Sequence, residues 1–407
     1  MRLAHKIALH PTPEQAEYFL RASGVARFAW NWALDRWQQE YALWKEYQCG
    51  PRPSEVSLRG MLNAIKDDAF PWMREVTKNA PQQAIKNLGA AFRNFFEGRA
   101  KYPKFKKKGV ARDTFRADNG TDTAHPNAVR VDGKRIKLPV IGWIKMREAV
   151  RLVGNIKSAI VSRIADRWFV SLTVEVDHVP PVRENQAVGG VDLGVKALAT
   201  LSDGTVILGP KALRKRLKIL RRRSRAHSRK VKGSANRRKS AKRLARLHAR
   251  ITNIRQDAIH QATTHIVRTF EVIGIEDLNV RGMMGNRRLA LAIADIGACE
   301  FRRQLEYKAP VHGSRVAVAG RWFPSSRLCS ACGHLHVGLT LAEREWICAG
   351  CGVTHDRDGN AAINLKNFAA SSAVTACGAD RSGLALAGKV KRAVVKQEPK
   401  HGLFVPV

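Results

Sequence analysis

Residues 329–365 read CSACGHLHVGLTLAEREWICAGCGVTHDRDGNAAINL, and this stretch decides how the second half of the chain is interpreted. Two Cys-x-x-Cys pairs, Cys329 with Cys332 and Cys348 with Cys351, stand 15 residues apart. Four thiolates at this spacing can surround one zinc ion as a tetrahedron. Two disulfides are the alternative, but we expect no secretory signal and the chain has few other cysteines. We therefore predict one structural Zn²⁺.

An acidic helix start follows the second cysteine pair. Counted from Asp358, residues Ala361, Ala362 and Leu365 fall at i+3, i+4 and i+7 and share one helix face. Asp358 therefore begins the face that packs on the domain, where a carboxylate is costly unless a metal ion compensates it. Asp356 fits better as the N-cap. Two alternatives stay open: both aspartates only cap the helix, or Asp356 is the metal ligand.

The composition indicates a polyanionic partner. The chain has 407 residues, 72 Lys+Arg against 34 Asp+Glu, and a net charge of +38. Its length suggests two to three domains, and such an excess of positive charge must face a polyanion or solvent. Nucleic acid is the leading partner, and a membrane surface is the weaker alternative because the sequence has no apolar run long enough to span a bilayer. The N-terminus lacks the apolar core of a signal peptide, so we expect a soluble, cytoplasmic protein.

A helical segment follows a short strand at the N-terminus. Residues 1–10 alternate like a strand, and Thr12 is a plausible helix cap. Helical periodicity continues to about Arg99, with breaks near residues 50–53 and at Pro71. We expect most aromatic residues of this segment to lie in the core.

The basic loop YPKFKKKG (102–109) ends this segment. Lys104 and Lys106 alternate there with aromatic residues, which suits a loop that contacts a nucleic-acid backbone. A solvated basic loop is the alternative.

Short strands dominate from about residue 112 to 179. Asp132-Gly133 separates two apolar runs, which is a hairpin signal. Several strands at this spacing suggest a small β-barrel that the N-terminal strand can join. Pro180 and the polar residues after it mark a linker.

A second domain then begins with acidic residues at strand positions. Residues 187–209 are typical of three antiparallel strands, and Asp192 lies in the first among apolar and glycine residues, where a lone carboxylate is costly. FEVIGIEDL (270–278) is typical of a buried strand that ends in Glu276. We expect a helix over about 289–307 and a further strand over 314–320.

A basic run lies between these strands. Residues 211–255 contain many lysines and arginines but no aspartate or glutamate, and Gly233-Ser234 divides them into two helical arms. A charge run is usually a solvated face, but one this one-sided is better interpreted as a phosphate-binding surface. The candidate contacts are Arg221, Arg222, Arg223, Arg237 and Arg238.

The order of these elements is β-β-β-α-β-α-β, a zinc insertion and a final helix. This is the plan of the ribonuclease-H-like α/β fold, in which Asp192, Glu276 and Asp358 would meet at one edge of a mixed sheet. Two divalent ions about 4 Å apart could then activate a water and stabilise the leaving oxygen in phosphodiester cleavage. Mg²⁺ is the expected ion because oxygen ligands suit a hard cation.

The motifs GVDLGVK, IGIEDLNVRGM, THDRDGNAAINL and the two cysteine pairs resemble the TnpB (OrfB) proteins of bacterial insertion sequences, relatives of type V CRISPR effectors. LHPTPEQ, GVARFAWN, APQQAIKNL, YPKFKKK and KLPVIGWIK extend the resemblance over nearly the whole chain except its tail. It implies an RuvC-like nuclease whose carboxylates match Asp192, Glu276 and Asp358. It also implies a guide RNA and a target DNA that is cut beside a short flanking motif. Lys78 and Gln82 match the positions at which the family reads this motif.

The resemblance also implies a division into domains and a location. We expect a bacterial or archaeal, nucleoid-associated protein. The expected parts are a wedge-like β-barrel (1–10 and 111–180), a helical recognition domain (11–110), an RuvC-like nuclease domain (186–320) with its final helix (353–369), an inserted zinc ribbon (321–352) and a disordered tail (370–407).

Three other functions compete with an RNA-guided endonuclease. A transposase that itself catalyses strand transfer could use the same fold, but the zinc ribbon before the third acid and the upstream segments favour the guided nuclease. A nuclease-dead, RNA-guided DNA-binding regulator would be expected to lose carboxylates that this chain keeps. A zinc-ribbon RNA-binding protein without enzymatic activity leaves the acidic residues unexplained.

Overall fold

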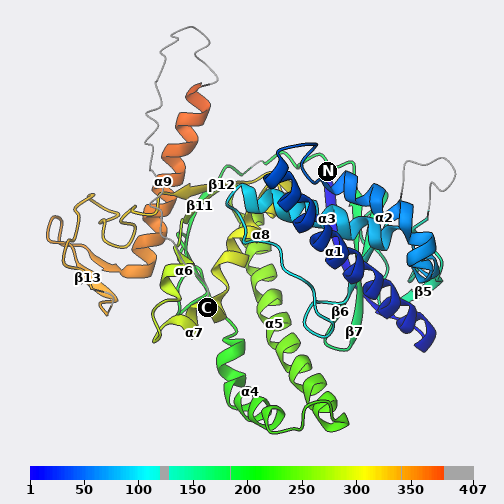
Figure 1. Cartoon of the computed structure of the whole chain (residues 1–407). Helices are drawn as coiled ribbons and strands as arrows, with labels where there is room; N and C mark the ends of the chain where they lie inside the picture. The colour runs from blue at the N-terminus through cyan, green and yellow to red at the C-terminus, as the bar shows by residue number, and fades with distance from the viewer. Residues whose placement is uncertain (120–127, 184, 341, 380–407) are drawn as a thin grey trace. The chain divides into compact units, whose positions relative to one another are not determined.

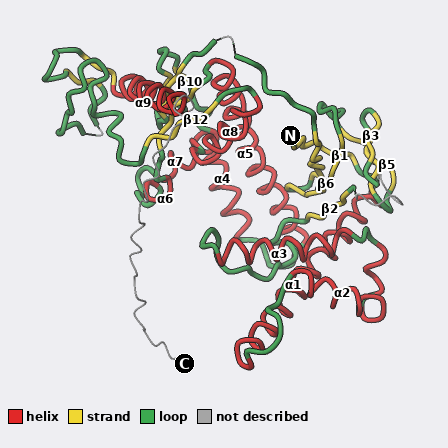
Figure 2. The backbone as a smooth tube through the Cα atoms, turned by 90° about the horizontal axis from the view of Figure 1, so that it is seen from above, coloured by secondary structure: helices red, strands yellow, loops and turns green. Residues whose placement is uncertain are grey.

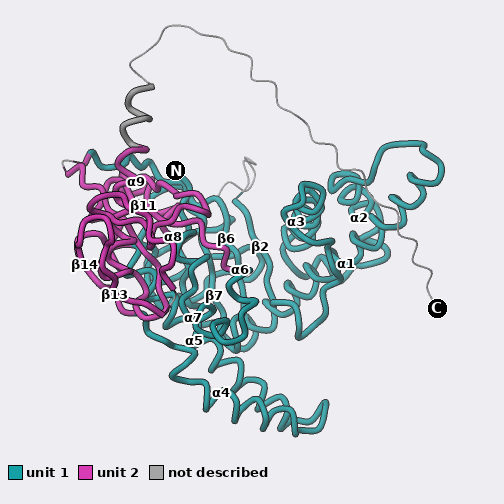
Figure 3. The backbone as a smooth tube through the Cα atoms, turned by 90° about the vertical axis from the view of Figure 1, so that its left-hand side faces the viewer, with its two compact units in different colours: residues 1–182, 209–263, 281–304 teal, residues 183–208, 264–280, 305–407 magenta. Residues whose placement is uncertain are grey.

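A computed structural model describes the chain except for residues 120–127, 184, 341 and 380–407 (Figure 1). The described chain divides into two compact units (Figure 3). Unit 1 comprises residues 1–182, 209–263 and 281–304, and unit 2 comprises 183–208, 264–280 and the described part of 305–407. These units divide the segment expected as one nuclease domain, so the domain boundaries given above stay a prediction. No described helix is long and apolar enough to cross a membrane.

Figure 2 distinguishes the helices and strands of the chain by colour. The helices are α1 (Pro13–Tyr47), α2 (Glu55–Ala69), the 3₁₀ helix η1 (Pro71–Glu75), α3 (Asn79–Phe96), α4 (Ala212–Ser228), α5 (Ala235–Thr269), α6 (Val280–Met283), α7 (Ala290–Ile296), α8 (Ala298–Val311) and α9 (Arg357–Ala379). The strands are β1 (Arg2–His10), β2 (Thr114–Asp118), β3 (Arg130–Asp132), β4 (Arg135–Leu138), β5 (Gly142–Met146), β6 (Asn155–Ile164), β7 (Arg167–Glu175), β8 (Val188–Asp192), β9 (Ala199–Leu201), β10 (Val206–Ile207), β11 (Val272–Glu276), β12 (Arg315–Ala319), β13 (Glu345–Ile347) and β14 (Thr354–Asp356).

The first helical segment begins and breaks where its residues predict. Thr12 caps α1: its side chain accepts from the backbone of Gln15, whose side chain accepts from the backbone of Thr12. This reciprocal pair satisfies two of the amide groups left free at a helix start. The breaks around residues 50–53 and before Pro71 separate α1, α2 and η1 as expected.

The strands of unit 1 form one seven-stranded antiparallel sheet in the order β2-β6-β7-β1-β5-β4-β3. The N-terminal strand β1 lies at its centre between β7 and β5, which confirms that residues 1–10 join the later strands. The hairpin expected at Asp132-Gly133 joins β3 to β4. No described ladder pairs β2 with β3, so closure into a barrel stays a prediction.

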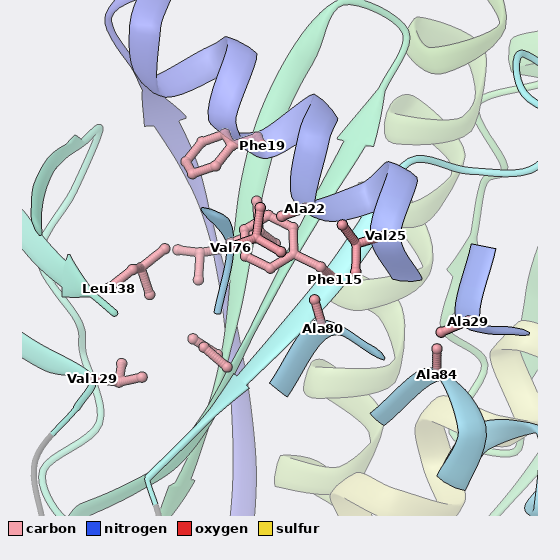
Figure 4. Packing of buried hydrophobic residues seen from close by; sticks show 14 of the residues in the cluster. Phe19, Ala22, Val25, Ala29, Val76, Ala80, Ala84, Phe115, Val129 and Leu138 are labelled. Atoms are coloured by element: carbon pink, nitrogen blue, oxygen red, sulfur yellow. The ribbon is translucent and has the colours of Figure 1, made fainter. Parts of the chain in front are cut away.

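The core of unit 1 lies between this sheet and the helices α1 and α3. Figure 4 shows Phe115 of β2 surrounded by Ala22 and Val25 of α1 and by Ala80 of α3. Small residues at these contact positions let the two helices approach each other closely. Trp30 and Trp37 of α1 are also buried, as predicted for the aromatic residues of this segment.

The basic run forms the two helical arms that the sequence predicts, α4 and the first part of α5. They are joined by a turn at Gly233, whose φ of +84° favours glycine. Leu247 and Ile251 of α5 pack against Ala212 of α4, so the arms form a hairpin with an apolar seam (Figure 1).

Unit 2 is built on a five-stranded sheet in the order β10-β9-β8-β11-β12. β8, β9 and β10 pair antiparallel, and β11 runs parallel to both β8 and β12. Helix α9 packs against β8, β11 and β12. The chain order of these elements agrees with the order predicted from the sequence.

Two glycines let α9 rest directly on the sheet. A Cβ atom at Gly190 of β8 would lie 1.8 Å from the carbonyl oxygen of Ala362, and one at Gly274 of β11 would lie 2.2 Å from that of Leu365. No side chain fits in either space. The helix backbone therefore contacts both strands at a distance that only glycine allows.

Two predicted helix boundaries differ from the structure. The helix expected over 289–307 is two helices, α7 and α8, because Gly297 takes a φ of +73° between them. Helix α9 continues past residue 369, where we expected the disordered tail to begin, as far as Ala379. The alanines of this extension favour helix, which the composition-based prediction underestimated. The rest of the expected tail lies outside the described residues.

Candidate active site and zinc centre

The register of β8 and β11 sets Asp192 beside Glu276. The two strands are parallel with Gly190 opposite Gly274 and Val191 opposite Ile275, so the next residues along each strand are the two acids. Side chains alternate along a strand, and each acid therefore shares the sheet face of the glycine two residues before it. That face is the one on which α9 lies. Two residues far apart in the sequence thus point toward the same helix.

The start of α9 brings the third carboxylate to this place. Asp356 Oδ2 accepts a hydrogen bond of 2.8 Å from the backbone N–H of Gly359, which confirms the prediction that Asp356 is an N-cap. Asp358 lies in the first helical turn, and its Oδ1 accepts from the Arg344 guanidinium at 3.4 Å. The Asp356 carboxylate is thus used as the helix cap, whereas the Asp358 carboxylate pairs with Arg344 of the ribbon.

The surroundings of Asp192 disfavour the charge of its carboxylate. The pKa of the Asp192 carboxyl is raised to about 8, mainly by burial and also by the negative charges of Glu276, Asp358 and Asp356. The Arg357 charge opposes this rise. Burial beside these acidic residues therefore disfavours the charged form of Asp192. That Asp192, Glu276 and Asp358 form one metal site stays a prediction.

Ser325 is a member of this site that the sequence analysis missed. It is buried, and its hydroxyl donates a hydrogen bond to Glu276 Oε1. Its carbonyl oxygen accepts from the side-chain amide of Asn364 on α9, at 2.7 Å. The segment before the first cysteine pair therefore connects Glu276 on the sheet to the helix that carries Asp358.

Two buried asparagines on α9 hold that segment in place. Asn360 and Asn364 both donate to the Leu328 carbonyl, at 2.7 and 2.6 Å, and Asn360 accepts from the Ser330 backbone at 2.9 Å. Buried amides keep their place only when their hydrogen bonds are made, so these contacts fix the segment against the helix. The signal was visible in NAAIN, where two polar residues stand four apart beside predicted core residues.

The four cysteines form the cluster that their spacing predicts. Their Sγ atoms all lie within 4.8 Å of one another. Cys329 Sγ lies 3.7 Å from Cys351 Sγ, and Cys332 Sγ lies 3.6 Å from Cys348 Sγ. A zinc–sulfur bond of about 2.3 Å in a tetrahedron implies sulfur–sulfur distances of about 3.8 Å. A disulfide would need about 2.05 Å. The donor set therefore fits one Zn²⁺, and the disulfide alternative is wrong.

Each cysteine pair is shaped by the same turn. The N–H groups of Gly333 and Gly352 donate to the carbonyls of Cys329 and Cys348, at 2.9 and 2.8 Å. Both glycines take a positive φ, of +77° and +74°, which other residues rarely adopt. The glycine after each Cys-x-x-Cys pair thus completes its knuckle.

His355 joins the zinc cluster to the start of α9. Its Nε2 atom lies 3.0 Å from Cys329 Sγ, and the side chain is buried. It belongs to β14, which pairs with β13 of the ribbon and ends at the helix cap Asp356. A hydrogen bond from an imidazole to a metal-bound thiolate orients the ligand. The histidine was not singled out from the sequence.

Lys78 and Gln82, predicted to read the flanking DNA motif, line one cavity in unit 1. This cavity has a volume of about 470 Å³ and lies beside α2, η1 and α3, with the cationic residues Arg59, Lys66 and Arg74 also in its wall. The two side chains therefore face one space, as their spacing implies. Their role in reading DNA stays a prediction.

The residues predicted to contact a nucleic-acid backbone lie in different environments. Lys104 is exposed, whereas Lys106 is partly buried with its Nζ 3.5 Å from the centroid of the Trp30 ring. The solvated-loop alternative therefore does not describe Lys106.

The arginines of the basic arms also differ. Arg221, Arg222, Arg223 and Arg238 are exposed. Arg237 instead donates to the carbonyls of His227 and Lys230 and closes the turn between the arms. Its predicted contact with nucleic acid would compete with these bonds.

The fold is similar to that of a protein whose structure was solved in complex with RNA and DNA. The structure described as a Cas12f1–sgRNA–target DNA complex matches with a TM-score of 0.57 and 16% identity, over 88% of this chain and 83% of that one. At this identity the likeness concerns the fold alone. The chain therefore shares its fold with Cas12f1.

Family models and curated relatives identify the family. The models described as "Probable transposase", "Cas12f1-like, TNB domain" and "Helix-turn-helix domain" match residues 171–287, 299–365 and 1–45. A putative RNA-guided DNA endonuclease of Streptomyces pristinaespiralis is 38% identical over 98% of this chain and 97% of its own length. The InsQ protein of Escherichia coli K12, with the same description, is 35% identical over 92% of this chain and 94% of its own length. The chain belongs to the TnpB (OrfB) family, which confirms the resemblance seen in its motifs.

Proposed function

We propose that the chain is a transposon-encoded, RNA-guided DNA endonuclease with an RuvC-like, ribonuclease-H-like catalytic domain. The observation that carries this proposal is that Asp192 and Glu276 end two neighbouring parallel strands, while Asp358 lies in the first turn of α9, the helix that packs on these strands. Full-length relatives described as putative RNA-guided DNA endonucleases support the same activity. The guide RNA and the target DNA are the expected partners.

The donor set at this site fits hard divalent cations. All three residues offer carboxylate oxygens, which Mg²⁺ prefers. Two such ions, when bound, would activate a water and stabilise the leaving oxygen of a phosphodiester. Asp192 and Glu276 would hold them from the sheet and Asp358 from the helix. Ser325 orients Glu276 through its hydroxyl, and Arg344 balances the charge of Asp358 from the ribbon.

The rest of the chain would bind and align the nucleic acids. The proposed recognition segment (11–110) holds the cavity lined by Lys78 and Gln82, and the arms present exposed arginines. The proposed wedge (1–10 and 111–180) supplies the seven-stranded sheet. Long basic side chains on helices suit phosphate contacts that carry no sequence information. The zinc ribbon, by contrast, would serve the structure of the active site.

The test is cleavage by the purified protein with the RNA that copurifies with it. We expect Mg²⁺-dependent cutting of a DNA target complementary to that RNA, and no cutting after the RNA is removed by ribonuclease. Strand transfer without RNA would instead establish the competing transposase. Guided binding without cutting in the parent protein would establish the regulator.

A further inference from the structure

A second, smaller cavity in unit 1 is lined by positive charge. It has a volume of about 100 Å³ and lies among α1, α3, β2 and the loop between α3 and β2, and we call it the α1–α3 pocket. Four cationic side chains line it: Arg27, Lys106, Arg112 and Arg116. None of its residues belongs to the carboxylate site or to the cavity of Lys78 and Gln82.

Carboxylates pair with only two of these four cations. Asp113 accepts from Arg27 at 3.2 Å, and Asp118 pairs with Arg116. Among the described residues no carboxylate pairs with Lys106 or Arg112. The pocket therefore keeps about two positive charges without a partner. A backbone phosphodiester carries one negative charge, so these two cations are more than enough to neutralise it.

Lys106 is held in this pocket at a cost. Its ammonium lies over the Trp30 ring, and burial together with the Arg27 charge lowers its pKa to about 8. A lysine that reaches solvent freely would not be affected in this way. The Asn31 side chain fixes the backbone of the same residue, accepting from its N–H at 2.7 Å and donating to its carbonyl at 2.9 Å. The Trp30 ring and the Asn31 side chain therefore hold Lys106 in a defined position.

A buried hydroxyl in the pocket wall also lacks a partner. Ser23 of α1 is 2% exposed, and its Oγ atom makes no hydrogen bond. Leaving such a group unsatisfied costs about 1–3 kcal/mol, so an unsatisfied hydroxyl beside free cations indicates a missing acceptor. A water needs only about 10–15 Å³ of such space, so this pocket has room for a tetrahedral oxyanion.

We propose that the α1–α3 pocket binds one phosphate group of a nucleic-acid backbone. Ser23 and Lys106 donate to its oxygens from inside the pocket, and Arg112 covers it from the exposed side. The pocket is too small for a nucleotide base, so the contact is independent of sequence. The proposal of a phosphate site rests on the proposed function only for the source of the phosphate. That source is the guide RNA or the target DNA.

The first test uses inorganic phosphate and the full-length protein without nucleic acid. We expect phosphate to raise the melting temperature saturably at constant ionic strength, compared with chloride. Ser23→Ala and Arg112→Gln should lose most of this rise, and Lys104→Gln, which neutralises an exposed lysine of the same loop, should keep it. Arg112 is exposed, so its substitution leaves the core intact. An equal rise in Arg112→Gln and the parent would overturn the proposal.

The second test finds the phosphate. Neutral methylphosphonate linkages are placed one at a time, in one arm along the guide RNA and in the other along the target DNA. We expect one linkage whose neutralisation weakens binding about tenfold in the parent and has no further effect in Arg112→Gln. The arm that contains this linkage identifies the source. Full additivity at every linkage would overturn the pocket as a phosphate site and leave the endonuclease activity unaffected.

Discussion

The carboxylate site of unit 2 and the basic arms of unit 1 hold their charges in different ways. Asp192 and Glu276 are placed by strand register, and Asp358 by a helix that rests on two glycines. The arginine side chains of α4 are instead exposed and make few contacts. Chemistry at a phosphodiester needs positions correct to fractions of an ångström, whereas backbone binding adds many loose contacts. Single changes should therefore be severe in the first region and small in the second.

The largest effect is expected from the acids themselves. Asp192→Ala, Glu276→Ala or Asp358→Ala should each lower cleavage by about 10³-fold or more, because each removes a ligand of the ions that the reaction needs. Guide RNA binding and guided DNA binding should remain, as filter-binding measurements would show. Asp356→Ala is the matched control, since it removes only a helix cap worth about 1 kcal/mol. Loss of cleavage in Asp356→Ala with retention in Asp358→Ala would exchange their roles.

The second largest effect on cleavage is expected from a methyl group introduced beneath α9. Gly274→Ala puts a Cβ where the Leu365 carbonyl lies 2.2 Å away, so the helix must move by about 1 Å or more. A displacement of this size costs about 10²-fold in rate. Gly320→Ala is the control, because nothing lies within 4 Å of its Cβ. Parental cleavage by Gly274→Ala would show that α9 does not need this close contact.

Loss of zinc from the ribbon should also lower cleavage, because the ribbon leads into the helix that carries Asp358. Cys348→Ser should lower zinc content and cleavage together, because structural zinc supplies folding free energy to the ribbon that leads into Asp356 and Asp358. Guide RNA binding should change much less. Elemental analysis beside a cleavage assay measures both quantities. A zinc-free variant that cuts at the parental rate would separate the ribbon from the active site.

A smaller effect is expected from Ser325→Ala. The hydroxyl orients Glu276 without forming part of the donor set, so we expect about a tenfold loss of cleavage and a higher Mg²⁺ concentration for half-maximal rate. Mn²⁺ binding to the same variant should weaken in parallel. Ser325→Thr should restore both, and Ser326→Ala should change neither. If the Mg²⁺ concentration for half-maximal rate did not change in Ser325→Ala, Ser325 would have only a packing role.

The smallest effect per residue is expected on the basic arms. Replacing Arg221, Arg222 and Arg223 together by glutamine should flatten the slope of log affinity against log salt by up to about 3, if each contacts a phosphate. Cleavage at saturating nucleic acid should stay near the parental rate. An unchanged slope would return these arginines to a solvated face.

Local patterns predicted the parts of the fold that depend on nearby residues. The cysteine spacing gave the metal cluster, and i+3, i+4 and i+7 counting gave the buried face of α9 and the cap at Asp356. The order of strands and helices placed Asp192 and Glu276 at the same edge of one sheet, where the register of β8 and β11 sets them. In each case the information lies within one element or in the sequence of elements.

The residues that were missed depend on contacts between distant segments. Ser325 reaches Glu276 only because Asn360 and Asn364 hold its segment against α9. Lys106 was predicted as a nucleic-acid contact, but its place over the Trp30 ring was not foreseen because Trp30 lies in a distant helix. The break at Gly297 was missed because a single glycine is tolerated inside many helices. None of these features produces a regular spacing of residues that sequence analysis could detect.

The two glycines under α9 also define where the chain can change in length. Because Ala362 and Leu365 are each seated above one glycine, the helix is fixed in rotation as well as in height. One residue added between Asp358 and Ala362 would turn the carboxylate by about 100° away from the sheet while the helix stayed seated. Residues added within the ribbon loops would leave that angle untouched. Insertions and deletions should therefore be tolerated before Asp356 and excluded after it.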